Sequence, residues 1–313
     1  MKIVVLDGYT ENPGDISWGP IEALGEVTVY DRTAYEESPL IAERIGDADV
    51  IVINKTPISK ETMDKCPNLK AIAVLATGYN VVDYEYAKAK GIPVMNVPVY
   101  GTDNVSQFAV SLLLEVCSHI GHHSDSVYAG EWAENADWCY WHYPMIEVSG
   151  KTAGIIGLGR IGRDTASLCT GIGMKVAGYD PFLTKEQIEG MGYEYYANYE
   201  DLLKDCDVIS IHVPLTKETE NMVSAKQLKE MKNTAIIINC SRGGIINEAD
   251  LIEALDSGEI AGAGLDVFVG EEIHPGNPLL DAKNLIFSPH SAAQTREAVI
   301  NMATMCVEGC KAV

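Results

Sequence analysis

The sequence lacks any apolar run that approaches the roughly 20 residues a membrane-spanning helix requires. Hydrophobic residues nevertheless make up 47% of the 313 residues, which is ample for a large core. The chain opens with MKIVVLDG, a charged residue followed by a strand-like run, without a small-residue cleavage site behind a long apolar segment. We therefore expect neither a membrane partner nor a secretory leader.

Basic residues are scarce in the chain. Lys and Arg number 23 against 45 Asp and Glu, which gives a formal net charge of −22. A charge of this sign repels polyanions, so no nucleic acid and no anionic membrane is expected as a partner. An anionic substrate must then be held by local cations and by backbone N–H groups.

The eight cysteines form no CxxC pair and are scattered, mostly within apolar runs. This usage is typical of reduced thiols and predicts a cytoplasmic protein. His119, His122 and His123 could place two imidazoles on one helical face, as a metal site needs, but a solvated helix end is the simpler interpretation. We expect no bound metal.

A glycine-rich motif lies at the centre of the chain, between residues 152 and 180. An apolar strand runs into Gly157, Gly159 and Gly162, a helical segment follows, and a second strand ends at Asp180. In a dinucleotide-binding motif these glycines permit a tight turn, close approach of the pyrophosphate, and packing of helix on strand. The acid accepts hydrogen bonds from the adenosine ribose and would repel a 2′-phosphate. The motif predicts NAD rather than NADP.

Strand-like apolar runs alternate with helical segments on both sides of this motif. The expected strands are 2–7, 26–31, 49–54, 70–75 and 93–98 before it, and 207–214, 234–244, 261–268 and 284–290 after it. A long helical pattern covers 104–120, and a last helix covers 292–311. Apolar strands separated by helices indicate parallel sheets that are covered on both faces.

The chain length suits two domains. We predict an α/β fold of two doubly wound parallel-sheet domains, in which a Rossmann dinucleotide domain is inserted into a flavodoxin-like substrate domain. Residues 1–100 and 289–313 form the substrate-binding domain in this interpretation. Residues 101–288 form the dinucleotide-binding domain.

Three polar residues follow strands of the second half, where ligands of parallel sheets bind. They are Arg242, Glu271 and His290. Reduction of a 2-keto acid needs a cation for the carboxylate and an acid for the forming alkoxide, and a carboxylate beside an imidazole favours its protonated form. Taken singly, each residue also fits a plainer role: a surface ion pair, a solvated acid or a hydrogen-bonded histidine.

At these residues the sequence resembles the D-isomer-specific 2-hydroxyacid dehydrogenase family. The resemblance rests on INCSRGGIINEADLIEAL, GAGLDVFVGEE, SPHSAA and VLATGYNVVD, in family order and spacing over nearly the whole chain. It implies that Arg242, Glu271 and His290 are catalytic. It also implies that the backbone N–H groups of Thr77 and Gly78 hold the substrate carboxylate.

The same resemblance implies further contacts with the cofactor. Asp266 would contact the nicotinamide carboxamide, and Arg160 and Ile161 would lie against the pyrophosphate. The remaining implied cofactor contacts are Val105, His212, Pro214, Thr219 and Cys240.

An aromatic-rich segment precedes the glycine motif. In the resembled family this region, here residues 121–147, is an arm that embraces a second subunit, and aromatic surfaces are typical of interfaces. We therefore expect a homodimer through the nucleotide domain and this arm. Trp141 is the expected contact with the substrate side chain.

The expected enzyme is an NAD-dependent oxidoreductase of small 2-keto and D-2-hydroxy acids. Within the family the resemblance is greatest to the glycerate dehydrogenases, also called hydroxypyruvate reductases, which implies reduction of hydroxypyruvate or glyoxylate. D-lactate and phosphoglycerate dehydrogenases are alternatives in the same family. A non-catalytic NADH-sensing corepressor is the alternative from another functional class.

Overall fold

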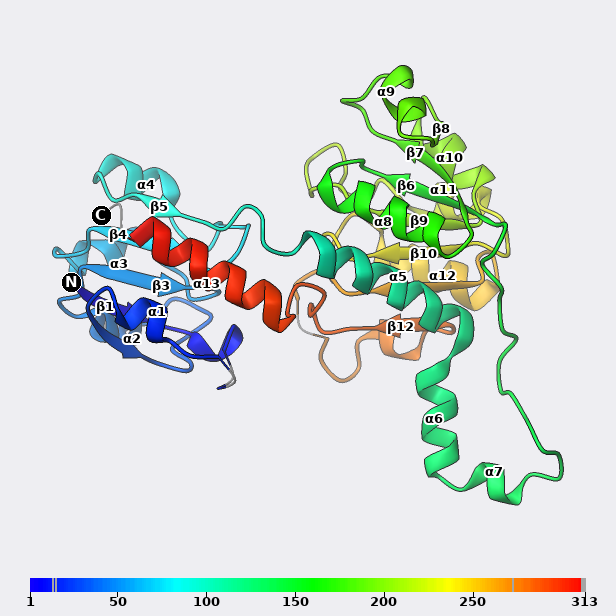
Figure 1. Ribbon diagram of the computed structural model, residues 1–313, viewed down its shortest axis with the longest axis horizontal. Helices are drawn as coiled ribbons and strands as arrows, with labels where there is room; N and C mark the ends of the chain where they lie inside the picture. Colours follow the sequence, from blue (N-terminus) through cyan, green and yellow to red (C-terminus); the bar gives the residue numbers. More distant parts are fainter. Residues whose placement is uncertain (13, 15, 272, 311–313) are drawn as a thin grey trace. The chain divides into compact units, whose positions relative to one another are not determined.

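The structure is a computed structural model that describes residues 1–12, 14, 16–271 and 273–310. The chain divides into two compact units. Unit 1 comprises residues 1–101 and 293–313, and unit 2 comprises residues 102–292. Unit 2 is therefore inserted between the two segments of unit 1, as Figure 1 lets the reader follow by colour.

Unit 1 contains a parallel sheet with the strand order β2-β1-β3-β4-β5. This is the flavodoxin-like order. Its strands are β1 (Lys2–Val5), β2 (Glu26–Val29), β3 (Val50–Ile53), β4 (Ala71–Val74) and β5 (Val94–Met95). Its helices are η1 (Gly8–Thr10), α1 (Gly19–Glu22), α2 (Pro39–Ile45), α3 (Lys60–Lys65), α4 (Tyr84–Ala89) and α13 (Arg296–Cys310).

Both faces of the unit 1 sheet are covered, which explains why β3 and β4 are apolar at every position. Ile51 and Ile53 of β3 point to the face where α2 and α3 pack. Val50 and Val52 point to the opposite face, where α1 and α13 contribute Ile21 and Met302. The last helix of the chain thus completes a core that the first strand begins.

Unit 2 contains a second parallel sheet, with the order β12-β11-β10-β9-β6-β7-β8. Counted from β6, this is the order of a Rossmann sheet. Its strands are β6 (Thr152–Ile156), β7 (Lys175–Tyr179), β8 (Glu194–Tyr195), β9 (Val208–Ile211), β10 (Ile236–Asn239), β11 (Gly262–Leu265) and β12 (Leu285–Phe287). The predicted fold class is confirmed by the two sheets.

Helices cover both faces of the unit 2 sheet as well. α5 (Thr102–Ser118), α8 (Arg160–Gly171) and α9 (Lys185–Gly190) cover one face, and α10 (Tyr199–Asp205), α11 (Ala225–Glu230), α12 (Glu248–Ser257) and η2 (Pro278–Asp281) cover the other. α6 (Ile120–Tyr128) and α7 (Glu131–Glu134) extend away from the sheet in Figure 1. In the described part of the chain, no helix combines the length and the apolar character needed to cross a membrane.

The long helix predicted over 104–120 is wrong at its carboxyl end. α5 ends at Ser118, and His119 adopts a left-handed backbone conformation with φ of 50° before α6 begins. Few side chains other than glycine, asparagine and aspartate take this conformation without cost, so apolar periodicity gave no sign of the break. The break turns α6 out of the line of α5 and starts the arm.

A buried carboxylate organises the carboxyl ends of β1 and β3. Asp7 accepts hydrogen bonds from three successive backbone N–H groups, those of Asn54 at 2.9 Å, Lys55 at 2.6 Å and Thr56 at 2.7 Å. The Asp7 side chain therefore connects the ends of the two strands through charge-assisted hydrogen bonds. In a sheet of this order, β1 and β3 flank the point at which ligands bind.

Glu11 is a second buried acid close to Asp7. Its Oε1 accepts a hydrogen bond from the Asn54 amide, whereas Oε2 has no hydrogen-bond partner among the described residues. Burial raises the pKa of Glu11 to about 8, with the Asp7 charge adding to the shift and a hydrogen bond from Gln294 opposing it. The fold therefore favours the neutral carboxyl.

The stability of the protein should consequently depend on the ionisation of Glu11. The folded state keeps a proton that the unfolded chain loses near its ordinary pKa of 4.5, so this group lowers stability progressively as pH rises from about 4.5 to about 8. Glu11→Gln replaces the neutral carboxyl by a neutral amide and should be more stable than the parent at pH 9 by on the order of 2 kcal/mol, with little gain at pH 5.

Chemical unfolding of the parent and Glu11→Gln at both pH values measures this difference. Glu43→Gln, an exposed acid on α2, is the matched control and should show no such pH dependence. An equal effect of Glu11→Gln at pH 5 and pH 9 would contradict a raised pKa.

Candidate active site

The glycine motif of unit 2 forms a tight turn between β6 and α8. Gly157 has φ of 93°, and a Cβ built there would lie 2.6 Å from the carbonyl oxygen of His212. A Cβ built on Gly162 would lie 1.9 Å from the carbonyl oxygen of Gly157. Neither position can therefore carry a side chain without moving the backbone.

Gly159 differs from these two glycines. A Cβ built on Gly159 would meet no described atom within 4 Å, and no side chain caps the helix that begins after it. Gly159 thus leaves space for a ligand beside the start of α8, and a helix start is the environment that a pyrophosphate requires. Arg160 and Ile161 form the first residues of α8, and the Arg160 side chain is exposed.

Asp180 follows β7, and the protein fixes its carboxylate. Oδ2 accepts a hydrogen bond from Leu158 N–H at 2.8 Å, and Oδ1 accepts one from Phe182 N–H at 2.9 Å. Each oxygen keeps a lone pair for a ribose hydroxyl. The carboxylate is oriented toward the glycine turn, because Leu158 lies within that turn.

The other predicted cofactor residues fall into two groups. His212, Pro214, Thr219, Cys240 and Asp266 follow the strands β9, β10 and β11, whereas Val105 is buried in the first turns of α5. Burial lowers the pKa of His212 to about 4, so this ring is neutral, and its Nε2 lies 2.9 Å from Ser210 Oγ. Thr219 Oγ1 donates to the carbonyl of Pro214 at 2.6 Å, which closes the turn after β9.

Arg242 lies on the loop after β10, and the last residue of that strand holds the loop. The buried Asn239 accepts hydrogen bonds at Oδ1 from Ser241 N–H at 3.0 Å and Ser241 Oγ at 2.7 Å. Its Nδ2 donates to the Arg242 carbonyl at 2.9 Å. The backbone of Arg242 is thereby fixed while its side chain is exposed.

Glu271 and His290 come together in the structure. Glu271 Oε1 lies 2.7 Å from His290 Nδ1, and both side chains are partly exposed. Nδ1 satisfies no hydrogen-bond geometry, so the contact is an ion-pair contact by distance rather than an aligned hydrogen bond. Both residues have positive φ, 30° for Glu271 and 51° for His290, which side chains rarely adopt outside functional or strained loops.

Asp266 binds the loop that carries His290. This buried carboxylate accepts hydrogen bonds from Ser288 Oγ at 2.6 Å, Ser291 N–H at 2.8 Å and Ala292 N–H at 3.0 Å. Sequence reasoning assigned Asp266 to the nicotinamide carboxamide and missed this role. The sequence shows only that a single polar residue, Asp266, ends an apolar strand, and this pattern does not identify the residues that the carboxylate binds. The contact with the carboxamide remains a prediction.

The two predicted residues of the substrate-carboxylate loop lie in unit 1, after β4. Thr77 Oγ1 donates to the Val97 carbonyl at 3.1 Å, and Asn96 Nδ2 donates to the Thr77 carbonyl at 2.7 Å. These bonds fix the backbone at Thr77 and Gly78 without using its N–H groups. The binding of a carboxylate there remains a prediction.

The arm, residues 121–147, carries Trp141, whose side chain is exposed. The irregular segment after α7 is hydrogen-bonded to α6. His122 Nε2 lies 2.7 Å from His142 Nδ1, and His142 N–H donates to His123 Nε2 at 3.1 Å. His119 stacks on Tyr143. The histidines thus have aromatic and hydrogen-bond partners within the arm, and no cluster suited to a metal ion occurs among the described residues.

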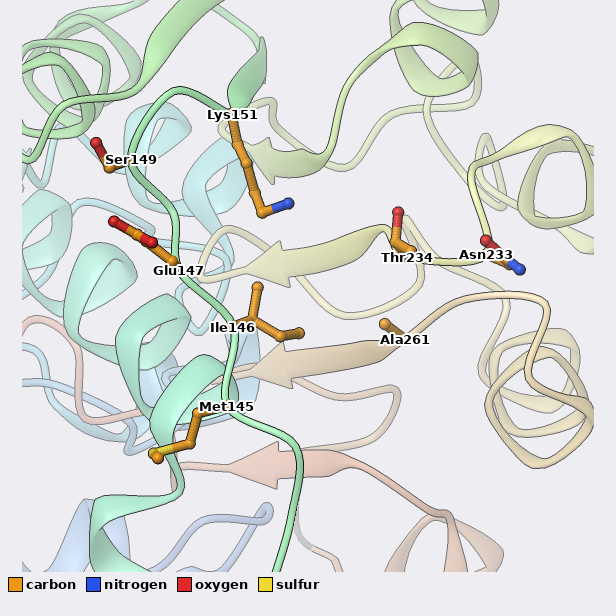
Figure 2. Close-up of a pocket in the computed structure, with 8 residues that line it drawn as sticks. All are labelled: Met145, Ile146, Glu147, Ser149, Lys151, Asn233, Thr234 and Ala261. Carbon is orange, nitrogen blue, oxygen red and sulfur yellow. The ribbon is translucent and has the colours of Figure 1, made fainter.

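A hollow of about 500 Å³ lies at the amino ends of the unit 2 strands, opposite the carboxyl ends that carry the predicted site residues. Figure 2 shows that it is lined by the segment from Met145 to Lys151 and by Asn233, Thr234 and Ala261, which precede β10 and β11. Ligands of parallel sheets bind at the carboxyl ends of the strands. This hollow at the amino ends is therefore separate from the predicted active site.

Known proteins resemble the chain along most of its length. The family model of the D-isomer specific 2-hydroxyacid dehydrogenase, NAD binding domain, matches residues 110–292. A hydroxypyruvate reductase from Blautia hydrogenotrophica is 51% identical over 95% of this chain and 92% of that protein. A glycerate dehydrogenase from Methylorubrum extorquens is 40% identical over 92% and 88%. The structure of D-lactate dehydrogenase with NAD⁺ from Lactobacillus jensenii has a TM-score of 0.77 at 30% identity, covering 98% of this chain and 95% of that one.

The glycine geometry makes opposite predictions for two alanine substitutions. Gly162→Ala should lower the thermal unfolding midpoint by at least several degrees, because its Cβ would overlap the Gly157 carbonyl. Gly159→Ala should leave the midpoint unchanged and weaken NADH binding by about tenfold or more, because its Cβ would occupy the space for the pyrophosphate. Calorimetry and NADH titration measure the two effects. Wild-type affinity in Gly159→Ala would disprove pyrophosphate binding at this turn.

Proposed function

The chain belongs to the D-isomer specific 2-hydroxyacid dehydrogenase family, as its motifs predicted, and we propose that its preferred reaction is the NADH-dependent reduction of hydroxypyruvate to D-glycerate. Family membership makes it an NAD-dependent oxidoreductase that interconverts a small 2-keto acid and its D-2-hydroxy acid. Reduction of glyoxylate to glycolate is the expected second activity. The contact between Glu271 and His290 supports reduction of a 2-keto acid, and the similarity to a hydroxypyruvate reductase supports the choice of substrate.

The residues of unit 2 fit NAD. The open turn at Gly159 would receive the pyrophosphate, and the fixed carboxylate of Asp180 would receive the ribose hydroxyls. That carboxylate would repel the 2′-phosphate of NADP. When bound, the reduced nicotinamide supplies the hydride.

The catalytic side chains would divide the remaining work. Arg242 would bind the substrate carboxylate and polarise the carbonyl, and His290 would give a proton to the forming alkoxide. Because His290 Nδ1 faces Glu271, Nε2 is the ring nitrogen left for the substrate. The Glu271 carboxylate would orient the ring for this proton transfer. In this proposal Thr77 and Gly78 add backbone N–H groups for the carboxylate, and Trp141 contacts the side chain of the substrate.

Several observations support hydroxypyruvate over the alternatives. The relative that is 51% identical is a hydroxypyruvate reductase and the one that is 40% identical is a glycerate dehydrogenase. A phosphorylated substrate would need additional cations, and the chain has only 23 basic residues against 45 acidic ones. Pyruvate lacks the 3-hydroxyl group that a polar partner would recognise. The strong acidity of the chain, with a formal net charge of −22, favours an enzyme over a protein that only senses NADH.

A homodimer through the nucleotide domain and the arm is the proposed assembly. Trp138 is 86% exposed and Trp141 is 62% exposed, and exposed aromatic side chains gathered in one segment are typical of interfaces. A cytoplasmic location is proposed because the cysteines that the structure describes are free and mostly buried. Fractionation of the producing cells tests the location.

Steady-state kinetics with a substrate panel tests the proposed reaction. With NADH, kcat/KM should be higher for hydroxypyruvate than for glyoxylate, pyruvate or phosphohydroxypyruvate. His290→Ala should lower kcat by roughly 10²- to 10⁴-fold and leave NADH affinity nearly unchanged, because the ring acts only in proton transfer. A higher kcat/KM for pyruvate or phosphohydroxypyruvate would overturn the substrate assignment.

If the arm mediates dimer formation, the mass of the protein in solution should depend on its concentration. Sedimentation should give twice the chain mass for the parent, and the double substitution Trp138→Ala and Trp141→Ala should shift the protein toward the monomer, because it removes apolar area from the contact. Phe182→Ala, at a 91% exposed aromatic outside the arm, is the control and should leave the mass unchanged. A monomeric parent would refute the homodimer.

A further inference from the structure

The loop that carries Glu271 is held by a side chain from another element. Val269 N–H donates a hydrogen bond to Glu248 Oε1 at 2.7 Å. Glu248 is the first residue of α12 and is half-buried. We propose that Glu248 is a positioning residue, which places Glu271 beside His290 by holding the backbone two residues earlier. This inference rests on the role of Glu271 in the proposed function.

The loop needs such an anchor because its backbone is unfavourable. Gly270 has φ of 79° and Glu271 has φ of 30°, and the backbone of a non-glycine residue is strained in this region. Conformations of this kind persist only where the surroundings impose them. The Val269 side chain is 62% exposed, so its packing contributes little restraint.

Packing restrains the start of the loop. A Cβ built on Gly243 would lie 2.0 Å from the Phe268 carbonyl oxygen, so the two backbones are in direct contact there. Phe268 is itself buried. The Glu248 bond acts at the next residue, Val269, directly before the turn at Gly270 and Glu271.

Capping of α12 does not account for the position of the Glu248 side chain. Asn247 is the N-cap, and its side chain accepts a hydrogen bond from Asp250 N–H at 3.1 Å. A carboxylate in the first turn of a helix also interacts favourably with the helix dipole. Asp250 already provides this interaction in α12, and the interaction does not require a contact with Val269. The charge-assisted bond to Val269 therefore has a separate consequence, which is the shape of the catalytic loop.

Glu248 completes a pattern shared by all three predicted catalytic residues. Asn239 binds the backbone of the Arg242 loop. Asp266 binds the Ser288 hydroxyl before His290 and the backbone N–H groups of Ser291 and Ala292 after it. In each case one polar side chain fixes a loop by its main chain and leaves the catalytic side chain exposed to a ligand. Glu248 does this for the loop of Glu271.

Loss of the Glu248 contact should mimic loss of the Glu271 charge. A displaced carboxylate no longer contacts His290 Nδ1, so the ring is held less firmly for proton transfer. We expect kcat/KM at neutral pH to fall about tenfold and the pH profile of reduction to change in the same way as in Glu271→Gln. NADH affinity should change little, because the contact lies outside the glycine turn.

Four variants separate positioning from helix stability in pH profiles of kcat/KM for hydroxypyruvate. Glu248→Ala and Glu248→Asp should both shift the profile; the second keeps a carboxylate at the helix start but is too short to reach Val269. Glu248→Gln keeps an acceptor oxygen and should restore most of the parent profile. Glu253→Ala, an exposed acid on the same helix, is the control and should leave the profile unchanged.

The same profiles on a Glu271→Gln background test whether Glu248 acts through Glu271. Adding Glu248→Ala to Glu271→Gln should give no further shift, because the charge to be positioned is already absent. A shift by Glu271→Gln without any shift by Glu248→Asp would overturn the positioning role and leave the proposed function intact. An unchanged profile in Glu271→Gln would overturn the proposed role of Glu271, and the positioning role with it.

Discussion

Backbone N–H groups beyond the ends of parallel strands no longer have acceptors on the neighbouring strand. In this protein, buried polar side chains accept their hydrogen bonds instead. Every such group must be paired when it is withdrawn from water. Asp7 pairs three amides after β3, Asn239 pairs the loop after β10, and Asp266 pairs the loop after β12. The loops at the carboxyl edges of both sheets depend on these few side chains for their shape.

This arrangement separates the residues that hold the site from the residues that react. Of the side chains that hold the loops, Asp7, Asn239 and Asp266 are buried and hydrogen-bonded, so they belong to the core as much as Ile237 or Leu265 does. The reacting side chains of Arg242, Glu271 and His290 are left partly or fully exposed on fixed backbones. Such preorganisation lowers the entropic cost of assembling a reactive geometry when substrate arrives.

Much of the fold was predictable because apolar strands and glycine turns are local features. The motif at Gly157, Gly159 and Gly162, and Asp180 at the next strand end, gave the cofactor and the sheet around it. The two-residue strand β8 was missed, since its residues show no continuous apolar run. Glu11 and Glu248 resemble solvated acids in the sequence, and only contacts with distant segments reveal one as buried and the other as an anchor. The proximity of Glu271 to His290 was expected from chemistry, whereas the side chains that hold their loops were not.

The discontinuity of unit 1 has a consequence for synthesis of the chain. Ile3 and Val5 of β1 share a core cluster with Val299, Met302 and Cys306 of α13, which is synthesised after unit 2. The whole of unit 2 emerges before these partners exist, so the order of synthesis allows unit 2 to fold first as a complete domain. Until α13 is made, only α1 among the described helices covers that apolar face of the first sheet, and nascent chains are most exposed to aggregation or chaperone binding over that interval.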